Sequence, residues 1–251
     1  MSKSEVPKFY VHASAIGTIM TKGFVKGPMN YVQEFAIEHK YKRTKEFTSK
    51  YTEKGKAVEE AAFTLINKML FPDKLLQKNT ERINDGVVSG EMDLWLKDWS
   101  GHESGLVLDA KSPWSIFTHP LFEDNHKNYE WQGQGYMRLT GAKHFWLVFC
   151  LVDAPMNLIF DEVRKYGYRT DQIEIPDQEA YEVARNMVYT EDGLNMVLKH
   201  FPGAKPIDWV PVPDDKRLKK FEYTYDPVMQ RQLEERVNEC QEYLNEIWHK
   251  I

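Results

Sequence analysis

Apolar side chains recur every three or four residues over 53–70, and this spacing predicts a helix that ends before Pro72. The same spacing predicts further helices elsewhere in the chain. These helices are expected over 12–20, 29–42, 124–141, 177–200 and 227–250. The pattern over 124–141 is weakened by Gly133 and Gly135.

The period changes to two over 88–96, where apolar residues alternate with Ser89, Glu91 and Asp93. This alternation predicts a strand with one polar face, and the preceding Asn84-Asp85-Gly86 predicts a hairpin turn. Other strands are expected over 75–83, 106–111, 144–152 and 158–163. The order helix–strand–strand–strand–helix–strand predicts an α/β core.

The length of 251 residues favours one elaborated domain over 1–251. Within it we expect a core over about 53–155, an N-terminal helical segment over about 10–50 and a C-terminal α-rich extension over about 156–251. A chain of this length buries enough apolar surface to fold without disulfides or a structural metal.

The cysteine count excludes several kinds of site. The chain has two cysteines, Cys150 and Cys240, and no C-x-x-C pair, so a zinc ribbon and a four-cysteine iron–sulfur cluster are unsupported. The longest apolar run, 145–152, is too short to span a bilayer, and the first residues lack a hydrophobic signal core. We therefore expect no membrane partner and a location in the cytoplasm.

The net charge of −5 excludes a protein that coats nucleic acid through bulk charge. Charge is unevenly distributed, however, because residues 1–60 carry 11 basic and 7 acidic side chains. Lys40, Lys42 and Arg43 lie in the densest basic cluster and are candidate contacts to an anionic partner. A solvated helix face is the alternative interpretation of this cluster.

The candidate chemistry lies on the predicted strands. Asp109 and Lys111 are two residues apart and therefore point to the same face of their strand. Asp93 lies on the polar face of the preceding strand, so the two carboxylates can converge on one cation if these strands pair. The alternative is a hairpin with exposed charges.

Glu59 is a candidate third carboxylate. At about 100° per residue it lies about 60° from Ala62, inside the apolar arc of its helix, whereas Glu60 lies about 160° away on the solvent side. A carboxylate in an apolar arc is costly unless a cation or a donor satisfies it. Three carboxylates suit Mg²⁺ or Mn²⁺, beside which a lysine can orient water or stabilise charge on a phosphate.

Tyr129, Gln132 and Tyr136 share one face of the next predicted helix. Core packing accounts for such a stripe, although a glutamine within it is unusual. Trp114 and Phe117 follow Lys111 and either pack in the core or in a loop, or stack on a ring of a bound partner.

Four short motifs occur in a fixed order and together resemble the PD-(D/E)xK nuclease superfamily. They are G-K-x-x-E ending at Glu59, G-x-x-D ending at Asp93, L-D-A-K-S-P starting at Leu108, and Y-x-x-Q-x-Q starting at Tyr129. Within the superfamily the chain most resembles the YqaJ-like, lambda-type phage recombination exonucleases, over about residues 10–155.

The resemblance implies a fold and a set of roles. The fold is a restriction-endonuclease-like core, a central mixed β-sheet flanked by helices in the order αβββαβ, with helical additions at both ends. Glu59, Asp93, Asp109 and the backbone carbonyl of Ala110 would bind one or two Mg²⁺ or Mn²⁺ ions. Lys111 would be the catalytic lysine, and Gln132 would position the water and the lysine.

The resemblance also assigns the 5′-phosphate of the DNA end to a serine in an S/T-A-S stretch, which Ser14 matches. A plain helix cap is the alternative role for Ser14. The arginine that the family has shortly before this serine is missing here, where only Lys8 lies nearby.

The implied activity is hydrolysis of linear double-stranded DNA from its ends, 5′→3′, in recombination or DNA end processing of a phage or prophage. The implied partners are DNA, a single-strand annealing protein and further copies of the chain in a trimer. The alternatives are an endonuclease of the restriction or branch-cutting type and a non-catalytic DNA-binding protein on the same fold.

Overall fold

The computed structural model describes residues 5–45, 50–74, 76–97, 105–123 and 129–251. It contains a four-stranded sheet in the order β4-β5-β6-β7 and a three-stranded sheet in the order β1-β3-β2. The strands are β1 (Val11–His12), β2 (Ile83–Asn84), β3 (Val88–Gly90), β4 (Leu94–Leu96), β5 (Leu106–Lys111), β6 (His144–Cys150) and β7 (Leu218–Thr224). The larger sheet is mixed, because β5 and β6 run parallel while β4 and β7 are antiparallel to their neighbours.

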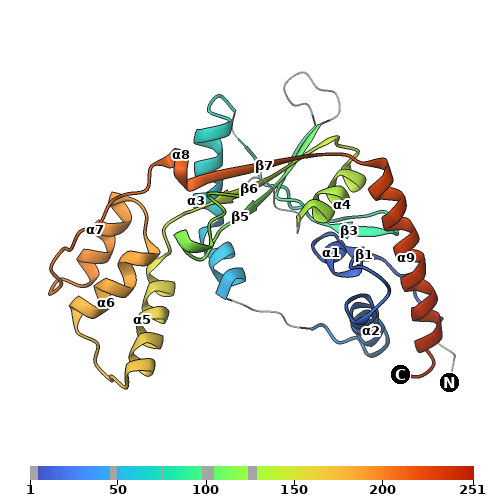
Figure 1. The fold of residues 1–251 in the computed structure, drawn as a ribbon, viewed down its shortest axis with the longest axis horizontal. Helices are drawn as coiled ribbons and strands as arrows, with labels where there is room; N and C mark the ends of the chain where they lie inside the picture. Colours follow the sequence, from blue (N-terminus) through green and yellow to red (C-terminus); the bar gives the residue numbers. More distant parts are fainter. Residues whose placement is uncertain (1–4, 46–49, 75, 98–104, 124–128) are drawn as a thin grey trace.

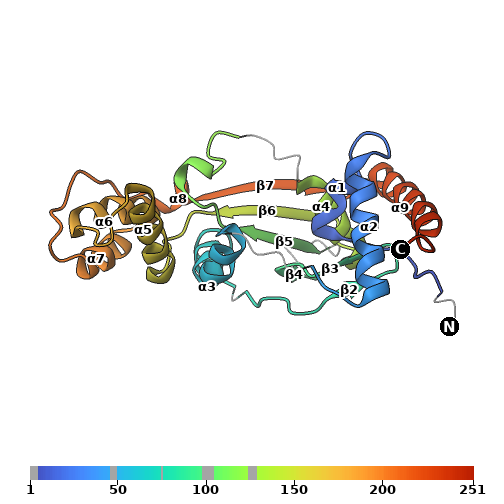
Figure 2. The same ribbon diagram turned by 90° about the horizontal axis from the view of Figure 1, so that it is seen from below.

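Helices pack on the faces of the larger sheet, and further helices lie beyond its two ends (Figures 1 and 2). The α-helices are α1 (Ile16–Ile19), α2 (Lys26–Tyr41), α3 (Lys50–Leu70), α4 (Glu130–Thr140), α5 (Met156–Thr170), α6 (Asp177–Ala184), α7 (Glu191–His200), α8 (Asp214–Arg217) and α9 (Pro227–Ile247). Short 3-10 helices occupy Ala13–Ala15, Ile116–Thr118 and Arg185–Met187. No helix in the described part of the chain combines the length and the apolar character that a bilayer span requires.

Apolar residues on the two faces of the larger sheet belong to two separate cores. On one face Val107, Phe145 and Leu147 pack with residues of α4, α1, α2 and α9. On the other face Leu106, Leu108 and Trp146 pack against α3. The alternation along β5 and β6 explains this division, because successive side chains point to opposite faces.

A third apolar cluster holds α5, α6 and α7 together at one end of the molecule (Figure 1). Two expectations for this region were wrong. The predicted strand 158–163 lies inside α5, whose buried residues Leu158, Ile159, Val163 and Gly167 follow helical spacing.

The predicted single helix over 177–200 is divided into α6 and α7 by the 3-10 turn Arg185–Met187. The Asp153 carboxylate accepts the backbone N–H groups of Tyr189, at 2.5 Å, and of Thr190, at 3.1 Å. Thr190 then caps α7 by accepting the N–H of Gly193 at 3.0 Å. These contacts interrupt the helix between α6 and α7.

The region before β5 also differs from expectation. The predicted strand 88–96 is two strands in different sheets, β3 and β4, and the predicted strand 75–83 is reduced to β2. The hairpin between β2 and β3 is confirmed, with Gly86 at a φ of 83° in its turn. Residues 124–128 of the predicted helix 124–141 and the loop 98–104 lie outside the described residues, and the described helix is α4.

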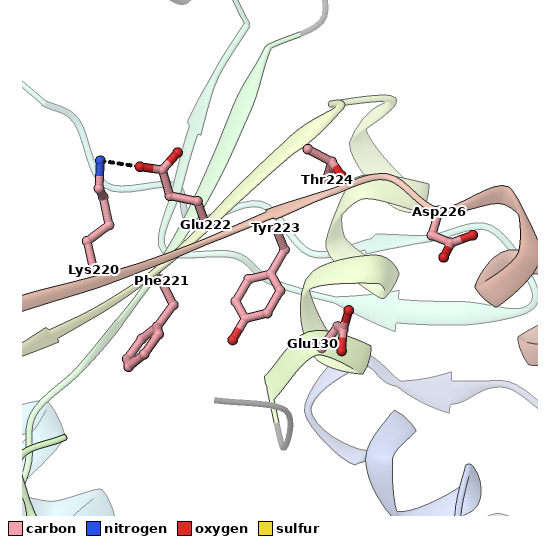
Figure 3. Close-up of a pocket in the computed structure, with 7 residues that line it drawn as sticks. All are labelled: Glu130, Lys220, Phe221, Glu222, Tyr223, Thr224 and Asp226. Carbon is pink, nitrogen blue, oxygen red and sulfur yellow. Dashed lines mark ion pairs between the residues drawn. The ribbon is translucent and has the colours of Figure 1, made fainter. Parts of the chain in front are cut away.

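Strand β7 was not predicted. Phe221 and Tyr223 point from this strand towards α4, whereas Lys220 and Glu222 lie on its other side and form an ion pair of 2.6 Å (Figure 3). The antiparallel pairing of β7 with β6 continues over seven residue pairs, so β7 completes the larger sheet.

Candidate active site

A cleft of about 740 Å³ lies between β5, α3 and α4. The residues that line it come from segments far apart in the sequence. They include Ser14, Glu59, Asp93, Asp109, Ala110, Lys111, Tyr129 and Gln132. The structure therefore brings the predicted metal ligands, the predicted lysine and Gln132 into one cavity.

The pairing of β4 with β5 brings the two strand carboxylates together, as expected. Leu94 lies opposite Leu108 in the antiparallel register, so Asp93 and Asp109 occupy the next pair of positions. The Asp93 Oδ2 atom accepts the backbone N–H of Ala110 at 2.7 Å. This contact holds the Asp93 carboxylate against the residue between Asp109 and Lys111.

Asp109 is buried and is surrounded by polar partners from α4 and from its own strand. Gln132 Nε2 donates to Asp109 Oδ1 at 3.1 Å and to the Tyr136 hydroxyl at 2.9 Å, and that hydroxyl lies 3.5 Å from the same Oδ1 atom. Lys111 Nζ lies 2.5 Å from Asp109 Oδ2 and 5.3 Å from the centre of the Tyr129 ring. Gln132 thus contacts the Asp109 carboxylate. The role that the resemblance implied for Gln132 was to position the water and the lysine.

The electrostatics of the cleft are unusual. Burial, together with the negative charge of Asp109, raises the pKa of Asp93 to about 7. Burial opposes the charged form of Lys111, but Asp109 more than compensates and raises the pKa of this lysine. Burial and Asp109 also raise the pKa of Tyr136 well above its usual value, so its hydroxyl stays protonated.

Glu59 lies on the cleft side of α3 and Glu60 is exposed, which agrees with the helix-face argument. Glu59 forms an ion pair of 2.7 Å with Lys78, and this hydrogen-bonded contact raises the pKa of Lys78. The sequence did not identify Lys78, because it lies in a segment without periodic structure. In this arrangement the Glu59 carboxylate is directed to Lys78 and not to the two aspartates.

The donor set fits a hard divalent cation. No three acidic, histidine or cysteine side chains among the described residues form a ready cage as they stand. However, the buried Asp109 Oδ2 accepts no hydrogen bond of normal geometry from the described part of the chain, although Lys111 lies beside it. Two close carboxylates, one with a raised pKa, are relieved by a cation, and Mg²⁺ needs only one or two protein carboxylates.

A second cleft, of about 380 Å³, follows β7 and is lined by Glu130 and by residues of that strand (Figure 3). Its Glu222 carboxylate is already paired with Lys220 on the same strand. The convergent aspartates, Lys111 and Gln132 line the larger cleft instead, so we place the candidate active site there.

Solved structures share this architecture over nearly the whole chain. A phage related exonuclease from Haemophilus somnus 129PT matches with 21% sequence identity and a TM-score of 0.72, and the match covers 97% of each chain. The alkaline exonuclease LHK-Exo from Laribacter hongkongensis matches with 13% identity and a TM-score of 0.58 over 96% of this chain and 90% of its own. The chain has the exonuclease fold. The complex of LHK-Exo with dAMP has the same fold, with a TM-score of 0.57. No family model and no curated protein matches the chain.

The exonuclease fold confirms the fold class that the four motifs implied, and α4 shows why its glycines are needed. A Cβ atom at Gly133 would lie 2.0 Å from Phe145 Cδ1, and one at Gly135 would lie 2.4 Å from Ile16 Cδ1. The two glycines therefore let α4 approach β6 and α1 closely enough for Gln132 to reach Asp109.

Ser14 lies in the 3-10 helix Ala13–Ala15, whose N-cap is His12, and no side chain caps that helix. Ser14 lines both the candidate active site and an adjoining cavity of about 360 Å³, together with His12 and Arg82. Burial and the nearby Arg82 guanidinium lower the pKa of His12. Arg82 lies 3.4 Å from Glu91 and supplies a cation beside Ser14 that sequence reasoning did not find.

The predicted basic cluster lies elsewhere. Lys40, Lys42 and Arg43 are not among the described residues that line the cleft. Lys40 Nζ instead donates to the carbonyl oxygen of Trp248 at 2.7 Å, whereas Lys42 and Arg43 are exposed at the end of α2. Among lysines of the described residues, Lys56 and Lys78 line the cleft together with Lys111.

Proposed function

We propose that this chain is a divalent-metal-dependent deoxyribonuclease of the YqaJ-like, lambda-type kind. It would hydrolyse linear double-stranded DNA from its ends, in the 5′→3′ direction. The observation that supports this proposal most directly is the convergence of Asp93, Asp109 and Lys111 beside Gln132 in one cleft.

Asp93, Asp109 and the backbone carbonyl of Ala110 would hold one or two Mg²⁺ or Mn²⁺ ions, with Glu59 joining once it leaves Lys78. Such an ion, when bound, supplies a lowered water pKa and stabilises negative charge on the phosphate. The charge of the two strand carboxylates and their separation from bulk solvent favour a hard cation over a soft one.

The side chains around Asp109 would position the reacting groups. Lys111 keeps its proton, because its pKa is raised, and can donate to a phosphate oxygen or orient the attacking water. Gln132 and Tyr136 hold the Asp109 carboxylate in one orientation. The Tyr129 ring lies beside the Lys111 ammonium and restricts its movement.

Ser14 and Arg82 would bind the 5′-phosphate of the DNA end. Both line the cavity that adjoins the cleft, so a phosphate there lies next to the carboxylates. Arg82 provides the bidentate cation that phosphate recognition favours, in place of the arginine absent near Ser14. Lys42 and Arg43 would contact the DNA backbone farther from the cleft.

The wider role that we propose is DNA recombination or end processing for a phage or prophage, in the host cell cytoplasm. By resemblance, the partners would be a single-strand annealing protein and two further copies of this chain in a trimer.

Digestion of two DNA forms tests the proposal. Wild-type protein is incubated with a linear duplex and with a covalently closed circle of the same sequence, in Mg²⁺ or Mn²⁺, with either end labelled. We expect loss of the linear form alone, beginning at the 5′ ends. Rapid loss of the circle would establish an endonuclease, and no cleavage in either metal would leave a DNA-binding protein on this fold.

Lys111→Ala is the control for the assigned cleft. We expect it to reduce cleavage by about a thousandfold or more while DNA binding persists. The substitution removes no core contact, and Asp109 keeps its hydrogen-bond partners Gln132 and Tyr136. Lys97→Ala, which changes an exposed lysine, should cut DNA at the wild-type rate. Near wild-type cleavage by Lys111→Ala would show that the active site lies elsewhere.

A further inference from the structure

The segment 112–123 leaves the catalytic strand β5 and passes along the rim of the cleft. Trp114, which precedes the 3-10 helix Ile116–Thr118, and Thr118, its last residue, line the cleft. Phe117 lies between them in sequence and is 90% exposed, and Phe122 is 94% exposed. Phe117, exposed between two residues that line the cleft, needs an explanation, because an exposed aromatic side chain beside a cleft is a feature of binding surfaces.

The backbone that carries Phe117 is firmly held. Ser115 and Thr118 form a reciprocal capping box, in which Ser115 N–H donates to Thr118 Oγ1 at 3.0 Å. Beneath the segment, the fully buried Lys54 donates from Nζ to the carbonyl oxygens of Pro113, at 2.9 Å, and Trp114, at 3.1 Å. The exposure of Phe117 is therefore a property of an ordered turn.

Positive charge accompanies these rings. Lys111 precedes the segment, and Lys56 lines the same cleft. Burial lowers the pKa of His119, which follows Thr118, against the opposing effect of a backbone hydrogen bond at Lys216, and the charge of Lys219 on β7 also lowers it. Aromatic rings next to cations are the combination that unpaired nucleic-acid strands require, with bases on the rings and phosphates on the cations.

We propose that Phe117 stacks on an unpaired base at the end of a DNA duplex whose phosphate backbone enters the cleft. The ring replaces the stacking partner that the base loses when the terminal pair opens, so Phe117 favours separation of the strands next to the scissile phosphate. This inference rests on the proposed function and adds a specific contact to it.

Cleavage rates on two ends of one duplex test this contact. One substrate has a blunt, fully paired end, and the other has three mismatched terminal pairs. For Phe117→Ala we expect about a ten- to hundredfold lower rate on the blunt end, the loss that corresponds to one stacked base, and a smaller loss on the mismatched end. Phe117→Trp should restore the blunt-end rate, because it retains an aromatic face.

Ile173→Ala is the matched control, because Ile173 is fully exposed and lies far along the chain between α5 and α6. It should cut both ends at the wild-type rate, and all variants should melt at the wild-type temperature. Equal losses by Phe117→Ala on both ends, or no loss, would overturn the stacking contact. So would a change in sedimentation of Phe117→Ala without a rate change, which would assign the rings to a protein interface. Failure of wild-type protein to cut either duplex would instead refute the proposed function.

Discussion

Asp109 shows how one buried charge can be fixed by several neighbours. One carboxylate oxygen meets Gln132 and Tyr136 of α4, while the other lies beside Lys111. Asp93, its neighbour across the strand pair, accepts the Ala110 N–H. The two carboxylates therefore differ in their contacts, and burial together with the charge of Asp109 raises the pKa of Asp93.

The raised pKa of Asp93 predicts a pH dependence of stability without metal. Its ordinary value is 3.8 and its folded value is about 7, so the folded state binds more protons than the unfolded state between these values. Stability from this group is therefore present below about pH 4 and is lost as the pH rises to about 7. Melting curves of wild type and Asp93→Asn across this range isolate the effect: wild type should lose stability relative to Asp93→Asn as the pH increases.

The same titration predicts how metal binds. A proton on Asp93 competes with the cation, so Mn²⁺ affinity should fall as the pH drops below about 7. Calorimetric Mn²⁺ titrations at several pH values measure this fall, and a flat profile would contradict the assignment of Asp93 as a ligand.

Glu59 and Glu60 offer a second prediction at the residue scale. Glu59→Ala should weaken Mn²⁺ binding about tenfold or more, because it removes a carboxylate that lines the cleft, whereas Glu60→Ala should change it little. Lys78→Ala should tighten Mn²⁺ binding, because it frees the Glu59 carboxylate from its ion pair. Calorimetry checks all three variants, and equal effects of the two glutamates would refute the helix-face argument.

The sequence located Asp109 and Lys111 because strand alternation decides their face, whereas Asp93 lies in the bend just before β4 and meets them because β4 pairs with β5. It did not locate Lys78 or Arg82, although both lie in the strand predicted over 75–83, because residues 76–82 form no strand and alternation does not set the direction of their side chains. The Asn79 N–H donates to the Asp93 carbonyl oxygen at 2.8 Å and β2 pairs with β3, and these tertiary contacts bring the segment beside the site.

At the scale of elements, α4 is the helix whose distance from the sheet decides the site. Gly133 meets Phe145, a fully buried ring on β6, so an added methyl group there has no room. The close approach of α4 to β6 in turn places Gln132 within hydrogen-bond distance of Asp109. A change that moves α4 outward should therefore weaken folding and the polar network together.

We predict that Gly133→Ala lowers the free energy of unfolding by about 1–3 kcal/mol, the range seen when a packed core is overfilled. Gly55→Ala is the matched control within a helix, because nothing lies within 4 Å of its added Cβ atom. It should stabilise the protein by about 0.5–1 kcal/mol through helix propensity. Urea denaturation measures both values, and similar changes in the two variants would contradict the packing argument.

Elements with strong, long patterns were predicted well. Strand β5 has the expected bounds, and α3, β6 and α9 lie within a few residues of theirs. The strand expected over 158–163 was wrong because six residues with four apolar members fit both periods, and the helical spacing is distinct only over the longer stretch Met156–Thr170. β7 was missed because Lys219 stands where the alternation needs an apolar residue, which leaves only Phe221 and Tyr223 alternating with polar neighbours, and because its pairing with β6 is a tertiary contact.

At the scale of the whole molecule, the net charge of −5 coexists with the basic residues that we propose contact DNA. Each phosphate contact adds about 0.9 to the slope of log affinity against log salt concentration. Arg82→Ala and Arg43→Ala should each reduce the slope by about this amount, whereas Lys40→Ala should change it less, because its ammonium is bound to the Trp248 carbonyl.

Fluorescence titration of a labelled duplex at several salt concentrations measures these slopes. An unchanged slope in Arg82→Ala would remove this arginine from the DNA path. A full reduction in Lys40→Ala would show that the ammonium leaves Trp248 when DNA binds.

The first apolar core joins α9 to the start of the chain. The Phe9 N–H donates to the Gln241 side chain at 2.7 Å across 232 residues of sequence, and Leu233, Val237 and Leu244 pack in the same core as Val32 and Phe35. During synthesis the apolar faces of the N-terminal segments therefore stay uncovered until α9 has been made. A nascent chain that stalls before residue 227 would expose these faces to chaperones, because the helix that covers them has not yet been made.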